Sequence, residues 1–291
     1  MKLATFTHQG RTSVGRVEGD QILDLGSALP TGCKSMLEVL QAGPALLTTL
    51  ETARPAGVKP IPLKDVRLEA PIRNPSKFLA IGLNYQDHLE EVLARGGKAP
   101  ESQIWFNKQV SCIVGPYDDV HLPRVSDRLD YEGELGVVIG TRCRHVPRER
   151  ALDVIAGYTV MNDVTVRDWQ RRSPTWTLGK SFDTHGPYGP WIVTRRDIPD
   201  PQNLMIRLWV NGELRQQMST GKMIHPIADQ IAYLTTVMTL EPGDLIATGT
   251  SKGAGWGMEP PVFLKSGDVV KVAIDQIGEI ANPVIAEPPP T

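Results

Sequence analysis

The sequence has few cysteines, no long apolar run and no excess of charge of either sign. Cys33, Cys112 and Cys143 are widely spaced and odd in number, which argues against a disulfide framework and indicates a reducing compartment. The first residues lack the apolar core of a signal peptide, and no run approaches the ~20 apolar residues that span a bilayer. We therefore expect a cytoplasmic protein.

The charge balance and the glycine-rich segments exclude several classes of ligand. A formal net charge of −2 gives no bulk attraction to nucleic acid or to an anionic membrane. The basic cluster at 142–150 has no interleaved aromatic residues, so a solvated loop is the better interpretation. The segment TGTSKGAGWG, from Thr248, matches neither the phosphate-loop nor the dinucleotide-binding spacing, although its backbone could approach a small ligand closely. No nucleic-acid or membrane partner is expected.

The chain is long enough for a small domain attached to a larger one. In residues 1–70, the segments TSVGRV and QILDL flank a turn at 18–20, and a helical pattern at 35–51 is interrupted near Gly43. The prolines that follow suit a linker. The sequence therefore predicts a small N-terminal α+β domain over 1–70 and a larger domain over 71–291.

Strand signals dominate the larger domain and predict a β-rich α+β fold. They lie in LDYEGELGVVIG, IAGYTVMND, GPWIVT, LMIRLWVNGE, DLIATGT and DVVKVAI, with turn residues between most of them. One helix is expected in PIADQIAYLTTVMTL, because Ile227, Ile231, Leu234 and Met238 recur with helical spacing. Packing of the helix against a sheet accounts for this stripe.

Three acids precede an apolar run in DYEGELGVVIG. Strand alternation places Asp130, Glu132 and Glu134 on one face, where three carboxylates repel one another. If this face is buried, the acids must be protonated, paired with cations or bound to a metal. If it is exposed, they form a solvated strand end, and this segment alone does not decide between the two.

Another acid, Asp163, ends a predicted strand, and VTVRDWQRR follows with a spacing that could start a helix. In such a helix Asp163, Arg167 and Gln170 share one face, since they are four and three residues apart. This set resembles one metal ligand beside groups that grip an anionic ligand. A helix-capping Asp followed by solvated polar groups is the alternative.

In IGLNYQDHLEEV, His88 and Glu91 become neighbours if a helix begins near Asp87. A Glu that accepts a hydrogen bond from one imidazole nitrogen fixes the tautomer, so that the other nitrogen can deprotonate a water molecule. A surface histidine near a helix start is the alternative.

Lys180 in WTLGKSFDTHGPYGP has apolar neighbours on both sides. This setting favours a partly buried cation that stabilises oxyanion charge over an ordinary surface lysine.

Taken together, these segments resemble the fumarylacetoacetate hydrolase family. The matching motifs run in a consistent order from about Pro71 to Val284: GLNYxDHxxE, WFNK, DYEGELGVVIG, GYTVMNDVTVRDWQ, WTLGKSFDTHGPYGP, and TGTSKGAGWG with PPVFLKSGDVV. Each motif alone is modest evidence, whereas six in order make the assignment specific. The resemblance implies a catalytic domain built as a mixed β-sandwich roll, and it implies a homodimer.

The resemblance also implies roles for the residues that match the family's motifs. They are the metal-binding carboxylates Glu132, Glu134 and Asp163, the water-activating pair His88 and Glu91, the oxyanion-stabilising Lys180, and the substrate-contacting Arg167, Gln170 and Thr250. Asp130 matches no ligand, so we expect Asp130→Asn to retain metal and activity and Glu132→Gln to lose both. The segment from Leu89 to about Trp105 is implied to be a lid that orders when substrate binds.

One motif departs from the family pattern. Many members read TGTPxGVG where this chain reads TGTSKGAGWG, so Ser251, Lys252 and Trp256 are expected to reshape the pocket. This departure bears on the identity of the substrate and not on the metal site.

An all-carboxylate site suits a hard divalent ion such as Mg²⁺, Mn²⁺ or Ca²⁺, and it argues against zinc and against an iron site with two histidines. A small anionic 2-oxo acid can chelate such an ion, which then stabilises an enolate as a Lewis acid. The leading hypothesis is metal-dependent hydrolysis of a carbon–carbon bond in a 2,4-dioxo acid of the acylpyruvate type. The alternatives are decarboxylation of a β-keto acid such as oxaloacetate, isomerisation of a 2-hydroxy-dienoate, a hydratase or dehydratase activity, and, last, a non-catalytic metal-binding scaffold.

Overall fold

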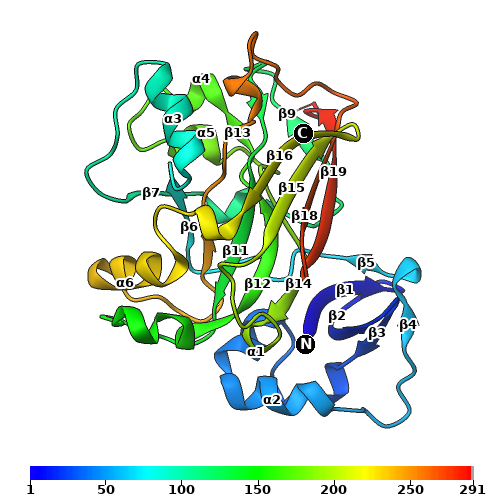
Figure 1. Cartoon of the computed structure of the whole chain (residues 1–291). Coiled ribbons are helices and arrows are strands. Elements are labelled where there is room, and N and C mark those ends of the chain that lie inside the picture. The colour runs from blue at the N-terminus through cyan, green and yellow to red at the C-terminus, as the bar shows by residue number, and fades with distance from the viewer. Residues whose placement is uncertain (290–291) are drawn as a thin grey trace.

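The computed structural model describes residues 1–289 and shows a strand-rich α+β protein, as the sequence predicts (Figure 1). The last two residues of the predicted larger domain, 290–291, lie outside the described part. Within 1–289, none of the helices combines the length and the apolar content needed to cross a bilayer.

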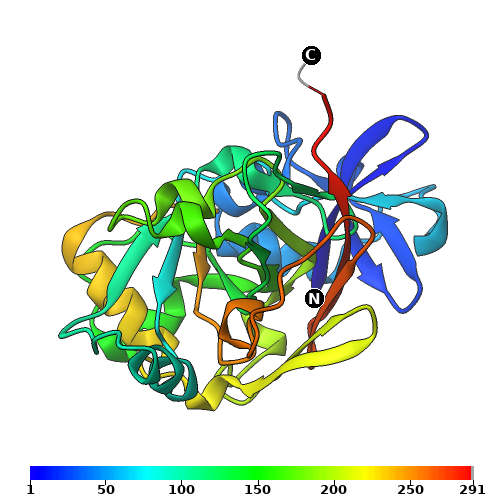
Figure 2. The same cartoon turned by 90° about the horizontal axis from the view of Figure 1, so that it is seen from above.

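The N-terminal residues form antiparallel strands with two helices packed against them. Helix α1 begins with a capping box formed by Ser35 and Glu38, and α2 begins after Gly43 with Pro44 in its first turn, so the predicted interruption is confirmed. Figure 2 shows these strands at one side of the molecule. The elements are β1 (Lys2–His8), β2 (Arg11–Glu18), β3 (Gln21–Asp24), α1 (Met36–Gln41), α2 (Pro44–Thr52), β4 (Ile61–Pro62) and β5 (Arg67–Leu68).

These strands continue into the large sheet, because β1 pairs with β14. The order of the large sheet is β4-β3-β2-β1-β14-β12-β11-β17-β6-β7, with β5 paired to β1 and β8 paired to β14. The division into domains near residue 70 stays a prediction. The further members of the sheet are β6 (Phe78–Gly82), β7 (Ile104–Asn107), β8 (Ile113–Val114), β11 (Gly133–Ile139), β12 (Ile155–Asn162), β14 (Gly186–Thr194) and β17 (Leu245–Ala247).

Strand β11 is buried along its whole length, which explains the uninterrupted apolar run of its sequence. It lies between β12 and β17 in the large sheet. The acids that precede and begin this strand are therefore brought next to a dry interior.

A second sheet packs against the large one and closes the main core. Its order is β16-β15-β18-β19-β9, and buried residues alternate along β15 and β18. Helix α6 (Ile227–Val237) buries Ile227, Ile231 and Leu234 in the same apolar cluster, so the predicted amphipathic helix is confirmed. The strands of this sheet are β9 (Val120–Leu122), β15 (Met205–Val210), β16 (Glu213–Ser219), β18 (Val269–Ile274) and β19 (Gly278–Ala286).

Short elements gather at one end of the sheets. Figure 1 shows α3, α4, α5 and β13 at the top, near the orange loop between β17 and β18 and away from α1 and α2. Strand β10 pairs with β13 beside this group. The elements are α3 (Gln86–Ala94), β10 (Leu129–Asp130), β13 (Thr165–Val166), α4 (Arg167–Gln170) and α5 (Thr177–Lys180).

Candidate active site

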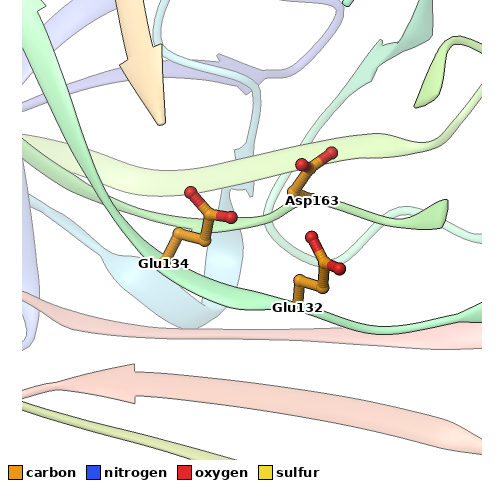
Figure 3. A group of neighbouring side chains, drawn as sticks. All are labelled: Glu132, Glu134 and Asp163. Carbon is orange, nitrogen blue, oxygen red and sulfur yellow. The ribbon is translucent and has the colours of Figure 1, made fainter. Parts of the chain in front are cut away.

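The three carboxylates predicted as metal ligands meet beside β11 and β12. Glu132 precedes β11, Glu134 lies within it and Asp163 follows β12. Each offers one carboxylate oxygen, and these oxygens lie within 4.8 Å of one another (Figure 3). The exposed fractions of the three residues are 5%, 1% and 1%. The alternative of a solvated strand end is therefore wrong, and we call this group the carboxylate triad.

Antiparallel pairing of β11 with β12 creates the triad. Gly133 pairs with Asn162, which places Glu132 beside Asp163 just beyond the paired residues. The backbone N–H of Asp163 donates to the carbonyl of Glu132 at 2.8 Å, and the backbone N–H of Glu132 donates to Asn162 Oδ1 at 2.9 Å. Glu134 is two residues along the strand and so shares a face with Glu132.

Burial and neighbouring charges shift the pKa values of the two glutamates in opposite directions. Burial, together with Asp163 and Glu132, raises the pKa of Glu134 well above its usual value. Burial also opposes ionisation of Glu132, but the cations Lys180 and Arg167 outweigh it and lower the pKa of Glu132 to about 2. Glu134 therefore keeps its proton to a higher pH than an ordinary glutamate does, and a cation that binds there must displace that proton.

The donor set of the triad fits a hard divalent cation. Within residues 1–289, the group that could hold an ion consists of carboxylates alone, without imidazole or thiolate. Oxygen ligands of this kind suit Mg²⁺, Mn²⁺ or Ca²⁺.

Lys180, at the end of α5, lies against the triad. Its Nζ donates to Glu132 Oε2 and to Asp163 Oδ2, both at 2.6 Å. Burial alone would lower the pKa of Lys180, but the carboxylates of Asp163 and Glu132 raise it. The lysine is only 2% exposed, so the predicted buried cation is confirmed and is buried more deeply than expected.

A second buried lysine, Lys108, was not predicted as a site residue. It is 1% exposed, and its Nζ donates to Asp163 Oδ1 at 2.7 Å, to the carbonyl of Val164 at 3.2 Å and to the carbonyl of Lys180. Each of the two carboxylate oxygens of Asp163 thus accepts a hydrogen bond from one lysine, Oδ1 from Lys108 and Oδ2 from Lys180. Lys108 is the last residue of the motif WFNK, and its place in that motif is the signal that could have found it.

The predicted pair of His88 and Glu91 lies on α3, which begins at Gln86, close to the expected start. His88 Nδ1 and Glu91 Oε2 are 3.0 Å apart, and His88 is 7% exposed, so the alternative of a surface histidine is wrong. With Nδ1 engaged by the carboxylate, Nε2 is left for water or substrate. Trp256 contacts the imidazole edge to face, with ring centroids 5.9 Å apart. A Cβ at Gly257 would lie 1.9 Å from Glu91 Oε1, so a larger residue there would displace the Glu91 carboxylate from its present position.

Arg167 joins several of the predicted residues. Its Nε donates to Asp130 at 2.8 Å, and its Nη1 donates to Gln170 Oε1 at 3.2 Å. The same Nη1 forms an ion pair with Glu132 Oε1 at 2.7 Å. The prediction of one helix face shared by Asp163, Arg167 and Gln170 is wrong for Asp163, because α4 begins only at Arg167. The preceding residues form β13, which pairs with β10, and this long-range pairing overrides the local helical spacing.

Asp130 has a different environment from the triad. It is fully buried, and besides Arg167 its carboxylate accepts hydrogen bonds from the backbone N–H groups of Gly255, at 2.7 Å, and Trp256, at 3.0 Å. Asp130 therefore anchors the glycine-rich loop and orients Arg167. It lies outside the group of carboxylates that could share an ion.

Thr250 is 4% exposed and comes from the loop after β17. Its hydroxyl donates to the carbonyl of Gly133 at 3.0 Å and accepts from Gln216 Nε2 at 2.9 Å. These bonds fix the loop against β11, and they place Thr250 in the wall of the cavity described next.

A cavity of about 480 Å³ brings most of the predicted residues together, and this volume is typical of small-molecule sites. Glu91 and Asp163 are not in its wall, but they contact His88 and Lys180, which are. Of the three departures from the family pattern, Trp256 lines the cavity. The predicted residues in the wall are His88, Glu132, Glu134, Arg167, Gln170, Lys180 and Thr250.

The fold and the site define a class of protein: a strand-rich domain with a carboxylate triad, a buried lysine and a His–Glu pair around one small-molecule cavity. Comparison with known proteins agrees. A family model described as fumarylacetoacetate (FAA) hydrolase C-terminal matches residues 77–285. The chain therefore belongs to the fumarylacetoacetate hydrolase family, whose members are enzymes.

Three relatives show the range of reactions in this family. The chain is 42% identical to an oxaloacetate tautomerase of Xenopus laevis, over 92% of this chain and 84% of the relative. It is 36% identical to the solved maleylpyruvate hydrolase of Sphingobium sp. SYK-6, in complex with manganese(II) ion and pyruvate, with TM-score 0.82, covering 99% of this chain and 100% of that one. It is also 36% identical to a solved 5-carboxymethyl-2-hydroxymuconate delta-isomerase of Mycobacterium smegmatis, with TM-score 0.78 and the same coverage. These relatives include a tautomerase, a hydrolase and an isomerase.

Proposed function

We propose that this protein is a divalent-metal-dependent hydrolase that cleaves a carbon–carbon bond in a small 2,4-dioxo acid of the acylpyruvate type. The observation that carries the proposal is the hydrogen-bonded pair of His88 and Glu91, whose imidazole lines the same cavity as Glu132 and Glu134 of the triad. Hydrolysis needs a base that activates water beside the carbonyl under attack, and an oriented imidazole supplies one.

Glu132, Glu134 and Asp163 are the residues that would hold the ion, and Mg²⁺ and Mn²⁺ suit their oxygens. The Sphingobium hydrolase was solved in complex with manganese(II) ion and pyruvate, which supports a divalent ion and a 2-oxo acid as ligands of this chain. When bound, the ion supplies Lewis-acid polarisation of the oxygens of the 2-oxo acid. The homodimer that the family resemblance implies stays a prediction.

The residues of the chain account for substrate binding and for activation of water. Arg167, held by Asp130, binds the carboxylate of the 2-oxo acid together with Gln170. His88 Nε2 removes a proton from water, and Glu91 stabilises the imidazolium that forms. The hydroxide attacks the distal carbonyl carbon, C4 of the dioxo acid.

Lys180 and His88 complete the cleavage. Lys180, which its carboxylate neighbours keep charged, donates a hydrogen bond to the oxyanion that develops on C4. When the tetrahedral adduct collapses, the bond between C3 and C4 breaks and its electron pair stays on C3. The acyl group leaves as a carboxylic acid and pyruvate leaves as its enolate, which the His88 imidazolium protonates at C3. One water is consumed, and one carboxylic acid and one pyruvate are formed.

The His88→Asn variant tests the proposal. Because the amide cannot act as the base, we expect kcat for an acylpyruvate to fall about 10²- to 10⁴-fold, while the Kd for Mn²⁺ stays unchanged. Loss of enol absorbance and formation of pyruvate report the reaction, and calorimetry reports the metal. The same substitution at the exposed His145 is the control. Wild-type hydrolysis by His88→Asn would rule out this base.

A second candidate is supported by the relatives. The Xenopus relative is named as an oxaloacetate tautomerase, and the Mycobacterium protein is named as an isomerase. Tautomerisation or decarboxylation of a β-keto acid such as oxaloacetate, and isomerisation of a 2-hydroxy-dienoate, use the same triad and require no attacking water. The products separate the candidates: pyruvate with a second acid indicates hydrolysis, and CO₂ indicates decarboxylation. Decarboxylation that survives loss of His88 and not of Glu132 would favour the second candidate.

A further inference from the structure

Three arginines surround one tryptophan in the wall of the cavity. The guanidinium carbons of Arg95, Arg167 and Arg171 lie 5.2, 5.7 and 6.0 Å from the centroid of the Trp256 ring. All four residues line the cavity whose wall also includes Glu132 and Glu134 of the triad. Arg95 directly follows α3 and Arg171 directly follows α4, so segments far apart in the sequence meet at this ring. We call Arg95, Arg171 and Trp256 the outer rim.

The cations of the outer rim are not neutralised by the protein as those near the triad are. Arg171 is exposed, and it forms no ion pair with any residue in 1–289. Arg95 donates to the carbonyl of Gly257 at 2.7 Å, and its one carboxylate neighbour, Glu259 at 3.7 Å, is 89% exposed. An exposed pair of this kind contributes little.

Two buried donors on residues of the same wall also lack an acceptor. Arg167 Nη2 and Trp256 Nε1 are buried and have no hydrogen-bond partner within the described residues. The side chain of Arg167 is 6% exposed, and its other nitrogens are taken by Asp130, Glu132 and Gln170. Buried donors of this kind are satisfied by a partner. Under the proposed function the carboxylate of the 2-oxo acid takes Arg167 Nη2, so Trp256 Nε1 is the donor left for a second acceptor.

We infer that Arg95 and Arg171 bind a second carboxylate at the acyl end of the substrate, so that this enzyme prefers dianionic 2-oxo acids over 2-oxo acids with an uncharged end. The inference rests on the proposed function only in placing the 2-oxo acid end at the triad. An arginine fork matches a carboxylate with two parallel hydrogen bonds. The indole face of Trp256 preorganises both guanidinium groups by cation–π attraction.

The test measures binding and not turnover, with matched pairs of probes. In the presence of Mn²⁺, calorimetry compares 2-oxoglutarate with 2-oxopentanoate, and 2-oxoadipate with 2-oxohexanoate. The members of each pair differ in a carboxylate against a methyl group at the distal end. For the wild type we expect at least one dianion to bind about tenfold or more tightly than its partner, as a charge-assisted hydrogen bond allows. Equal binding within both pairs overturns the inference.

The variants Arg95→Gln and Arg171→Gln locate the effect. Each is expected to remove most of the preference for the dianion and to leave the Kd of the monoanion unchanged. Arg172→Gln is the matched control, because Arg172 is the next residue and carries the same charge but is not part of the cavity wall. Its guanidinium carbon lies 3.7 Å from the centroid of the Trp169 ring instead. An equal loss in Arg172→Gln would show a general charge effect and overturn the assignment.

The same experiment keeps the inference separate from the proposed hydrolysis. A wild type that prefers dianions and hydrolyses no 2,4-dioxo acid supports the outer rim and refutes the hydrolase. A wild type that hydrolyses acylpyruvates and binds both members of each pair equally refutes the outer rim and leaves the hydrolase intact.

Discussion

Lys180 and Arg171 line the same cavity, but they differ in burial and in whether the protein supplies a carboxylate partner. Lys180 is 2% exposed and has two carboxylate partners at 2.6 Å, whereas Arg171 is exposed and has no ion pair within residues 1–289. We call the triad and the buried cations paired with it, Lys108, Arg167 and Lys180, the inner end of the cavity. A buried charge is costly unless it is paired, so the protein itself must supply the partners of these charges. An exposed cation has no such requirement and can be paired by a ligand. We therefore propose that the inner end carries out the chemistry and that the outer rim selects the substrate.

The largest effect is expected when the inner end loses a charge. Glu132→Gln removes a triad carboxylate and the shared partner of Lys180 and Arg167, so each buried cation loses one of its two carboxylate partners. We expect loss of Mn²⁺ binding and of activity, and a fall of about 3–5 kcal/mol in the free energy of unfolding. Calorimetry and chemical denaturation measure these. Glu90→Gln, on the exposed side of α3, is the control, and wild-type metal affinity in Glu132→Gln would exclude this residue as a ligand.

A smaller loss is expected from Lys108→Met. Asp163 keeps Lys180 as a partner, but one of its oxygens loses the cation that orients it. We expect the affinity for Mn²⁺ to fall about 10- to 100-fold, as is typical when a group that orients a metal ligand is removed. Lys108→Arg should restore part of the affinity, and Lys98→Met is an exposed control. Unchanged affinity would mean that Lys108 supports the fold alone.

The raised pKa of Glu134 makes metal binding depend on pH. The folded protein holds a proton there at pH values where the unfolded chain has released it. This contribution to stability is fully present below the usual pKa of 4.5 and is lost as the pH rises through the raised value. Because a cation must displace the proton, Mn²⁺ affinity should rise with pH by up to about tenfold per pH unit over the same interval. Calorimetry in buffers of different ionisation enthalpy measures the number of protons released when Mn²⁺ binds. If no proton were released below the raised pKa of Glu134, the predicted displacement of its proton would be wrong.

The smallest effect at the inner end is expected from Asp130→Asn. The triad stays intact, so Mn²⁺ affinity should not change, but Arg167 loses its carboxylate partner. We expect KM for the 2-oxo acid to rise about tenfold, the size of a weakened charge-assisted hydrogen bond. This revises the expectation that activity is retained, because the sequence does not show that Asp130 holds Arg167. Asp127→Asn, at an exposed position, is the control. An equal fall in metal affinity in Asp130→Asn would mean that Asp130 is itself a ligand.

Local patterns were sufficient to predict many of the elements. Alternation, β-branched residues and turn residues predicted β11, β12, β14, β15, β17 and β18, and the apolar stripe predicted α6. The spacing of His88 and Glu91 was also sufficient, because both residues lie within one helix and meet through its geometry.

Long-range pairing explains what the sequence could not show. The helix expected from Asp163 was displaced by the pairing of β13 with β10, which no local spacing reveals. Lys108 reaches Asp163 and Lys180 across 55 and 72 residues of sequence. The outer rim comes from three separate segments, and its arginines carry no motif of their own.

The division of roles between the inner end and the outer rim is tested most directly by steady-state kinetics of His88→Asn and Arg171→Gln. The substrates are two 2,4-dioxo acids, one with a carboxylate at the acyl end and one with a methyl group there. We predict that His88→Asn lowers kcat equally for both acids, and that Arg171→Gln raises KM for the dianionic acid alone. If Arg171→Gln instead lowered kcat equally for both acids, the outer rim would take part in the chemistry and the division would be wrong.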